Sequence, residues 1–198
     1  MQLESTTTNW LILGSGVSGQ SAFAFLRKKN HHVALFEQKE QTNHFSKDKK
    51  IISKLNDLEE FLKNKKPKVV LSPGFSSTHP AVLKCKQHQL QMVSEVQLGL
   101  CEFQGKTIAI TGTNGKTTIA LMCQHILKKT KTPCASAGNI GTPITSLNYK
   151  GLQIIVLELS SFQLEQSTDL KLDISIFNNF SKDHTSYHQN LSSYFKAK

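Results

Sequence analysis

The sequence predicts an α/β protein made of two successive domains, each built around a parallel β-sheet. Short apolar segments with the length of buried strands alternate along the chain with segments of helical period. This alternation begins twice, and each time the first strand runs into a glycine-rich turn and then a helix. The 198 residues give room for two small domains. We expect a first domain over residues 1–93 and a second over 94–198, with the boundary between Val93 and Gly105.

The first half reads as a βαβαβ unit, which implies a parallel sheet with right-handed crossovers. Its apolar strand Trp10–Leu13 enters the glycine turn, and the strand Val33–Phe36 ends on Glu37. The other expected elements are helices over 20–29 and 57–65 and strands over 69–71 and 92–93. Ser94 and Glu95 then open a short helix.

The second half restarts with the strand Lys106–Ile110 and a helix over Thr117–Lys129. The segment Leu152–Leu157 is almost continuously apolar, which is typical of a parallel strand buried on both faces. Further strands are expected over 133–137 and 173–177. A helix that begins at Leu191 reaches the end of the sequence with no following strand, so we expect an incomplete domain with a hydrophobic strand edge that promotes self-association.

Composition limits the kinds of function. Lys plus Arg number 24 against 14 Asp plus Glu, a formal charge of +10, but Arg27 is the only arginine. Base readout and bidentate phosphate recognition favour arginine, so we interpret the lysines as a solvated surface or a field for an anionic small ligand, and expect no nucleic-acid partner. No apolar run has the length of a membrane span and no signal peptide is visible, so we expect a soluble, cytoplasmic protein. The four cysteines lack the spacing of a zinc site or disulfide framework.

The first glycine turn has the spacing of the dinucleotide fingerprint. Gly14, Gly16 and Gly19 lie between a strand and a helix, and Glu37 ends the next strand. Glycines permit close approach of the backbone, and the helix N-terminus attracts an anion, so the turn predicts diphosphate binding without fixing which nucleotide is bound. The alternative is that these glycines serve only helix–strand packing.

The second glycine turn, TGTNGKTT over Thr111–Thr118, predicts a phosphate-binding P-loop. Its backbone N–H groups would surround phosphates, Lys116 would reach the β and γ oxygens, and the Thr117 hydroxyl would bind Mg²⁺. The usual early glycine is replaced by Ile110, so the loop is a shortened variant. ATP is the ligand that this motif favours.

Two acidic or metal-binding positions follow the next strands. Glu158 ends the strand 154–157, where a carboxylate can hold Mg²⁺ directly or through water. Asp183 and His184 lie in a loop after a later strand. A solvent-facing Glu and a structural His are the alternatives.

The motifs TGTNGKTT, Gly138–Gly141 and Glu158–Glu165 (ELSSFQLE), taken in this order, resemble the Mur ligases of peptidoglycan synthesis. Further matching segments are Ser72–Gly74 with His79–Pro80, Asp183–His184 and Tyr194–Lys198. The resemblance implies a Rossmann-like parallel-sheet domain followed by an incomplete P-loop (Mur ligase central) α/β domain.

The resemblance implies that the first domain holds the UDP of a substrate instead of a nicotinamide cofactor. The substrate-binding residues implied there are Val17, Ser18, Glu37, Lys39 and Gly74.

In the second domain the resemblance implies binding of ATP and Mg²⁺. The implied ATP-binding residues are Gly112, Thr113, Asn114, Gly115, Lys116, Thr117 and Thr118. The implied metal-binding residues are Thr117, Glu158, His184 and Lys198, the last with a carbamylated amine. Asn139 and Gln163 are implied in substrate binding, and Lys116, His184 and Lys198 in catalysis.

The implied reaction joins D-glutamate to UDP-N-acetylmuramoyl-L-alanine through an acyl phosphate, with ATP and Mg²⁺ as cofactors. The resemblance further implies a monomeric parent enzyme, with no membrane partner and with a third domain beyond this sequence, so we expect these residues alone to be inactive. Two alternatives stay open: an NAD(P)-binding redox or regulatory protein, and a nucleotide-binding fragment without catalysis.

Overall fold

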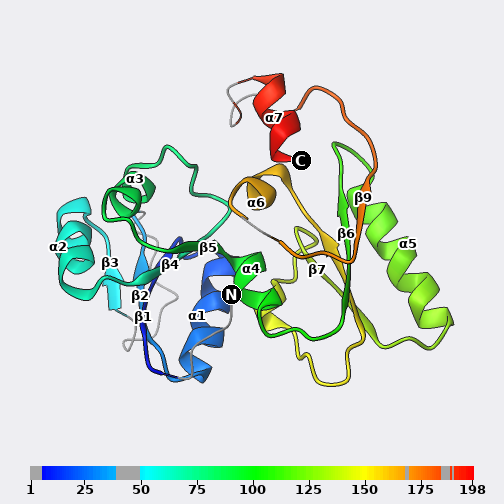
Figure 1. Ribbon diagram of the computed structural model, residues 1–198, viewed down its shortest axis with the longest axis horizontal. Helices are drawn as coiled ribbons and strands as arrows, with labels where there is room; N and C mark the ends of the chain where they lie inside the picture. The colour runs from blue at the N-terminus through cyan, green and yellow to red at the C-terminus, as the bar shows by residue number, and fades with distance from the viewer. Residues whose placement is uncertain (1–5, 39–49, 168–169, 184–187, 189) are drawn as a thin grey trace. The chain divides into compact units, whose positions relative to one another are not determined.

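The computed structural model describes residues 6–38, 50–167, 170–183, 188 and 190–198. The chain divides into two compact units, Met1–Cys101 and Glu102–Lys198. Figure 1 shows the elements of both units, and each unit is considered by itself.

The first unit is a five-stranded sheet with helices on both faces. The strands are β1 (Asn9–Leu13), β2 (His32–Phe36), β3 (Lys50–Ile52), β4 (Lys68–Leu71) and β5 (Met92–Ser94), in the order β3-β2-β1-β4-β5. The helices are α1 (Val17–Lys28), α2 (Leu55–Lys65), α3 (Pro80–Gln87) and α4 (Glu95–Leu100). Every strand pairing is parallel, as the sequence predicted. The strand order is that of a Rossmann-like domain.

Alternation along β1 explains why helices cover both faces of this sheet. Leu11 and Leu13 belong to one core cluster, which includes Leu58 of α2. Trp10 and Ile12 point to the opposite cluster, in which α1 and α4 take part. Because the chain reverses its direction of progress across the sheet between β1 and β4, a crevice forms at the carboxyl ends of these strands.

The second unit is a four-stranded parallel sheet in the order β7-β8-β6-β9. The strands are β6 (Lys106–Thr111), β7 (Cys134–Gly138), β8 (Ile154–Glu158) and β9 (Ile174–Phe177). The helical elements are α5 (Lys116–Lys129), the 3₁₀ turn η1 (Ile144–Ser146), α6 (Ser161–Glu165) and α7 (Leu191–Ala197). β6 lies between β8 and β9, so the turn that follows β6 is flanked by the ends of both neighbours.

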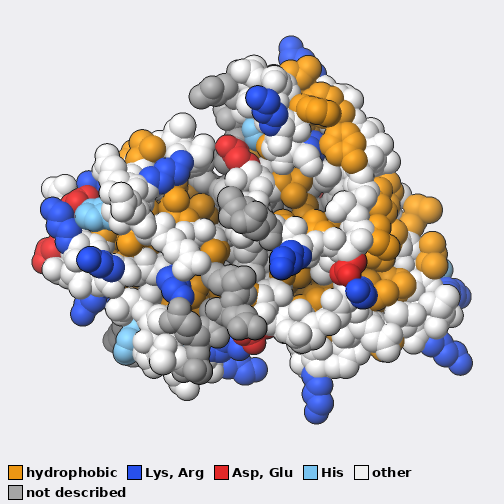
Figure 2. Space-filling model, viewed as in Figure 1, with side chains coloured by type: hydrophobic (Ala, Val, Ile, Leu, Met, Phe, Trp, Pro, Cys, Tyr) orange, Lys and Arg blue, Asp and Glu red, His pale blue; other side chains and the backbone are white. Residues whose placement is uncertain are grey.

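Part of the surface of the second unit is apolar (Figure 2). On α5, Leu121, Met122 and Ile126 are 49%, 58% and 60% exposed, and Ile174 of the outer strand β9 is 53% exposed. The expectation of an exposed hydrophobic strand edge therefore holds for the described part of this unit.

Several elements differ from the sequence expectations. The strand β3, the helices α3 and α6, and η1 were not expected, because each is too short to show a clear period. The helix α4 packs against α1, and the division between the compact units falls after α4, within the interval between Val93 and Gly105. None of the described helices combines the length and the apolar character that a bilayer crossing requires.

Candidate nucleotide and substrate sites

A cavity of about 610 Å³ lies at the crevice of the first unit. We call it the glycine-turn pocket. Its walls are the turn after β1, the residues after β2, and the segment after β4; the lining residues include Val17, Ser18, Glu37 and Gly74. Four of the five substrate-binding residues expected in this domain are thus brought together. The fifth, Lys39, lies outside the described residues.

The three glycines of the turn have different steric roles. A Cβ on Gly19 would overlap the backbone oxygen of Gly14, so this position requires glycine for close packing. Gly14 has a φ of +105° and lies against Ser72. Gly16 lines the pocket, and a Cβ built there meets no atom within 4 Å. Gly16 therefore leaves room at the helix N-terminus for a ligand.

The carboxylate of Glu37 closes one side of the pocket. Its Oε2 accepts hydrogen bonds from the backbone N–H of Ser15 at 3.1 Å and from the Ser15 hydroxyl at 2.8 Å. Burial lowers the pKa of His79, and the nearby Glu37 carboxylate opposes this shift. The hydrogen bonds between Ser15 and Glu37 therefore connect the glycine turn to the end of β2 and stabilise this side of the pocket.

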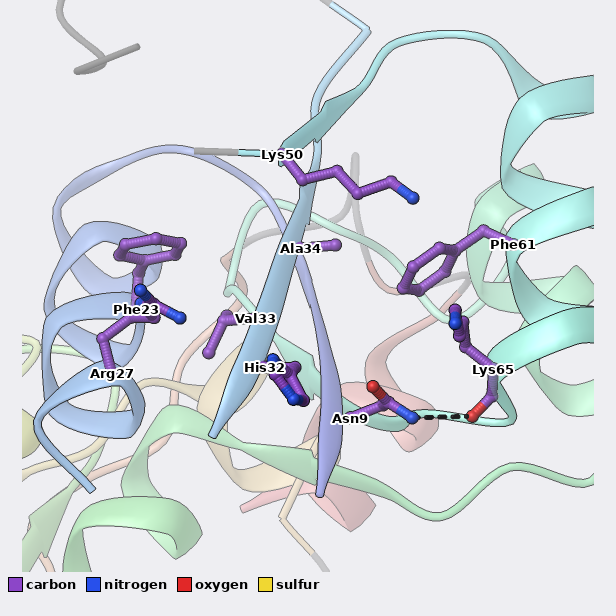
Figure 3. A pocket seen from close by; sticks show the side chains of 9 residues that line it. All are labelled: Asn9, Phe23, Arg27, His32, Val33, Ala34, Lys50, Phe61 and Lys65. Atoms are coloured by element: carbon purple, nitrogen blue, oxygen red, sulfur yellow. Dashed lines mark hydrogen bonds between the residues drawn. The ribbon is translucent and has the colours of Figure 1, made fainter. Parts of the chain in front are cut away.

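A second hollow of the first unit has a volume of about 350 Å³, and the described residues that line it are all different from those of the glycine-turn pocket. Figure 3 shows Phe23 and Arg27 on one side of β2, with Phe61 and Lys65 on the other. The Nδ2 atom of Asn9 donates a hydrogen bond to the Lys65 carbonyl at its base. None of the residues expected to bind substrate lies in this hollow, as far as the structure describes them.

In the second unit, the phosphate loop connects β6 to α5. Gly115 precedes the helix with a φ of +77°, a left-handed conformation that favours glycine. Lys116 folds back over the loop and donates hydrogen bonds to the carbonyls of Gly112 at 2.9 Å and Thr113 at 2.8 Å. The first-turn N–H groups of any helix lack intrahelical acceptors, so this end of α5 suits an anion.

Glu158 joins the phosphate loop to β7. The Thr117 hydroxyl donates to Oε2 of Glu158 at 2.6 Å, and Nδ2 of Asn139 donates to Oε1 at 2.8 Å. Glu158 is only 2% exposed, and it reaches this place because β8 pairs with both β6 and β7. The alternative that Glu158 only faces solvent is therefore wrong.

The donor set around Thr117 fits Mg²⁺. A hydroxyl and a carboxylate are hard oxygen ligands, and magnesium in nucleotide sites takes few protein ligands besides phosphates and water. No cluster of three His, Cys, Asp or Glu able to hold a metal occurs among the described residues. His184, expected as a further ligand, lies outside them.

Lys198 meets the loop from α7. Its Nζ donates to the carbonyl of Gly112 at 2.7 Å and to the Thr111 hydroxyl at 3.3 Å. Burial, and then the charge of Lys116, lower the pKa of Lys198 to about 8, and Asp183 opposes this shift. Two lysine amines thus share the Gly112 carbonyl.

Gln163 has a local structural role. Its Oε1 accepts from the backbone N–H of Ser160 at 3.0 Å, and its own N–H donates to the Ser160 hydroxyl at 3.2 Å. This reciprocal pair is the capping box that begins α6.

Sequence reasoning missed residues that contact the loop from the segment after β9 and from α7. Asn178 and Asn179 bond to Asn114, and the Tyr194 hydroxyl lies 3.2 Å from that of Thr113. The available signal was position: Asn178 directly follows a strand that pairs with β6.

Comparisons with known protein families match both halves of the chain. Residues 8–94 match the "Mur ligase MurD-like, N-terminal domain", and residues 110–198 match the "Mur ligase middle domain".

The chain is also similar to curated proteins that are named as ligases. A UDP-N-acetylmuramoylalanine–D-glutamate ligase of Leptospira interrogans is 37% identical over 191 residues, covering 95% of this chain and 40% of the relative. One from Buchnera aphidicola is 34% identical over 181 residues, covering 91% of this chain and 41% of the relative. The chain thus spans about 40% of the length of these relatives.

Solved structures share the fold. The UDP-N-acetylmuramate:L-alanyl-gamma-D-glutamyl-meso-diaminopimelate ligase of Neisseria meningitides matches with a TM-score of 0.59 and 16% identity, over 97% of this chain and 66% of that one. A UDP-N-acetylmuramate-alanine ligase of Thermotoga maritima matches with a TM-score of 0.54 and 20% identity, over 97% and 46%. With both domain matches in chain order and the loop, strand-end acid and glycine turn in place, the chain belongs to the Mur ligase family.

Proposed function

We propose that this chain is part of an ATP-dependent ligase that joins D-glutamate to UDP-N-acetylmuramoyl-L-alanine in peptidoglycan synthesis. The single observation that carries the proposal is the contact of Thr117 and Asn139 with one buried carboxylate, Glu158, beside a phosphate loop. The names of the relatives support the choice of substrates. We further propose that the whole enzyme, of which this chain is a part, is cytoplasmic and monomeric and needs neither a nucleic acid nor a membrane.

The glycine-turn pocket is proposed to hold the UDP end of the substrate. Its position at the carboxyl ends of β1 and β4 and its open Gly16 suit a diphosphate at the N-terminus of α1. Val17, Ser18, Glu37 and Gly74 are the lining residues proposed to contact it. A nicotinamide dinucleotide would use the same physical features, so the ligand must be tested directly.

The phosphate loop, residues 112–118, is proposed to bind ATP. Lys116 would leave the Gly112 and Thr113 carbonyls for phosphate oxygens, because a charged ligand offsets the loss of two neutral acceptors. Thr117 and Glu158 would hold Mg²⁺, which supplies neutralisation of phosphate charge. Asn139 would orient Glu158 and face the substrate.

The proposed chemistry has two steps. The γ-phosphoryl group moves from ATP to the L-alanine carboxylate, giving an acyl phosphate and ADP. The D-glutamate amine then attacks the acyl carbon, phosphate leaves with the bonding electron pair, and the nitrogen loses a proton to give the amide. Lys116 lowers the repulsion between the carboxylate and the phosphoryl group as they approach.

Lys198 is proposed to act as a carbamate. Reaction of an amine with carbon dioxide requires the unprotonated amine, and the lowered pKa of about 8 increases that fraction near neutral pH. Carbamylation would replace the positive charge of Lys198 with a negative charge. The anionic carbamate could then form an ion pair with the Lys116 ammonium. The residues proposed for catalysis are Lys116, His184 and Lys198. Gln163 would contribute to the substrate site indirectly, by capping the start of α6.

Calorimetric titration of the chain with UDP-N-acetylmuramoyl-L-alanine, and separately with NAD, tests the first-unit site. We expect binding of the UDP-sugar and none of NAD. Binding of NAD alone would favour a redox or regulatory protein and overturn the proposal. A G16S variant places a side chain in the pocket and keeps a residue that can cap the helix. It should therefore fold normally but bind the UDP-sugar more weakly than the wild type.

A parallel titration with ATP, with and without Mg²⁺, tests the second unit. We expect magnesium to strengthen ATP binding in the wild-type chain. We expect the K116M substitution to abolish ATP binding. ATP binding that is indifferent to both changes would contradict the role given to the loop.

A further inference from the structure

We propose that Asn179 is a positioning residue of the phosphate loop. Its carboxamide fixes the peptide groups of Thr113 and Asn114, so that the loop keeps the shape in which the first turn of α5 receives phosphates. This inference rests on the proposed ATP binding, and it adds a residue outside the phosphate motif to that site.

The carboxamide of Asn179 engages the tip of the loop on two sides. Its Oδ1 accepts from the backbone N–H groups of Thr113 at 3.1 Å and Asn114 at 2.9 Å. Its Nδ2 donates to the carbonyl of Asn114 at 3.0 Å. A carboxamide carries a donor and an acceptor side by side, so one side chain satisfies both peptide groups of Asn114.

The preceding residue, Asn178, also contacts the loop. The N–H of Asn178 donates to the carbonyl of Thr111 at 3.0 Å, which continues the β6–β9 ladder to the edge of the loop. Nδ2 of Asn178 donates to Asn114 at 2.9 Å. A Cβ on Gly112 would lie 3.2 Å from both the Asn178 Cβ and the Asn179 nitrogen, so the loop lies directly against this segment.

The shortened motif gives a reason for such a brace. Ile110 still belongs to β6, where the usual phosphate loop already has its early glycine. Few residues therefore turn the chain from β6 into α5, and two left-handed glycines, Gly112 and Gly115, are needed. Asn179, two residues beyond the end of β9, supplies hydrogen bonds that hold this turn.

This arrangement determines which backbone donors can meet a phosphate. The N–H groups of Thr113 and Asn114 are directed at Asn179. The N–H groups of the first turn of α5 lack helical acceptors and point out of its N-terminus. We infer that phosphate contacts from the backbone come from α5, and that Asn179 acts on them by holding the loop.

Amide hydrogen exchange of the full 198-residue chain tests the brace without any ligand. We expect the Asn114 amide to be protected in the wild type and to exchange faster in N179A. The Thr113 N–H also donates to the backbone carbonyl of Asn179 at 3.1 Å, which N179A retains, so its exchange should change less. N179D keeps the acceptor but replaces the donor that faces the Asn114 carbonyl, so it should retain more protection than N179A. Unchanged exchange of the Asn114 amide in N179A would overturn the inference, whether or not ATP binds.

Titration with Mg²⁺-ATP and with inorganic pyrophosphate tests the consequence. N179A should weaken both ligands by roughly threefold to tenfold, because exposed hydrogen bonds are worth about one kcal/mol each. A matched control is N148A, since Asn148 accepts a backbone N–H in an exposed turn away from the loop. Its affinities should equal those of the wild type.

Binding of the UDP-sugar to the first unit and the thermal midpoint separate this effect from misfolding. In N179A we expect unchanged UDP-sugar binding and a thermal midpoint that falls by only a few degrees, because loop hydrogen bonds alone are lost. Equal ATP affinity in N179A and the wild type would overturn the positioning role. Absence of ATP binding in the wild type would instead contradict the proposed function, and the exchange data alone would then decide the brace.

Discussion

The Thr117 hydroxyl donates a hydrogen bond of 2.6 Å to Oε2 of Glu158, and these two residues come from α5 and β8, 41 positions apart. The contact places a hard oxygen pair at the N-terminus of a helix, where a phosphate is favoured. Because the other oxygen of Glu158 is held by Asn139, the carboxylate has one orientation. The following predictions use this and other contacts.

Removing the charge of Glu158 should reduce the effect of magnesium on ATP binding. In E158Q we expect the gain in ATP affinity on adding Mg²⁺ to fall on the order of tenfold or more, because the charged oxygen ligand is lost. The Thr117 hydroxyl can rotate to accept from the new amide, so folding should persist. Calorimetry with and without Mg²⁺ measures the change; E60Q, on the surface of the first unit, is the control and should behave as wild type.

Substitution of two glycines in the same turn should have different effects, on stability at Gly19 and on ligand binding at Gly16. G19A should lower the free energy of unfolding by about 1–3 kcal/mol, because its Cβ would overlap the Gly14 carbonyl. G16S should change stability by less than about 0.5 kcal/mol, since serine is a good N-cap. It should nevertheless weaken UDP-sugar binding. Denaturant unfolding and calorimetry check both, and a stable G19A chain would contradict this packing argument.

The stability of the chain should depend on pH through Lys198. Its folded pKa of about 8 lies below its ordinary value of 10.5, so between these values the unfolded chain binds more protons and stability rises with pH. K198M removes this dependence. Thermal midpoints of wild type and K198M should therefore change relative to each other, in favour of the wild type, as the pH rises through this window. Parallel curves across the window would show that Lys198 titrates normally.

Acid should weaken the contact between α2 and α3. Hydrogen bonds from Lys84 and then His88 lower the pKa of Glu59 from 4.5 to about 2. The stabilisation from Glu59 is thus fully present above about pH 4.5 and is lost as the pH falls through about 2. E59Q should melt below the wild type near neutral pH and level with it in strong acid. A constant difference between the two melting curves at every pH would exclude a charge effect.

The apolar surface of the second unit should cause self-association. Ile174 on the outer strand β9 is 53% exposed, and strand edges of this kind pair with other chains. Sedimentation at increasing concentration should show species larger than a monomer, and I174K should reduce them because an edge lysine opposes pairing. A wild-type chain that sediments only as a monomer at high concentration would count against this prediction.

The sequence allowed the fold to be predicted where elements are long or strongly apolar. Strands such as Ile154–Glu158 and helices such as Lys116–Lys129 carry a clear period or an unbroken apolar run. Short elements could not be predicted: β3 has three residues, and α6 is begun by a capping box and not by a hydrophobic face. The role of Gln163 in that capping box became visible only when its partner Ser160 was located.

The sequence by itself determined the two glycine turns, the parallel α/β fold and the family, because these depend on local spacing and on patterns that survive without coordinates. Only the tertiary structure decided that Glu158 is buried against Thr117 and Asn139, that Lys198 shares a carbonyl with Lys116, and that Asn179 holds the phosphate loop. The reason is strand order: β6 lies between β8 and β9, although β7 follows it in the chain, and residues 41 to 86 positions apart meet at one sheet edge. A parallel sheet sets these meetings through long-range pairing, which no local pattern records.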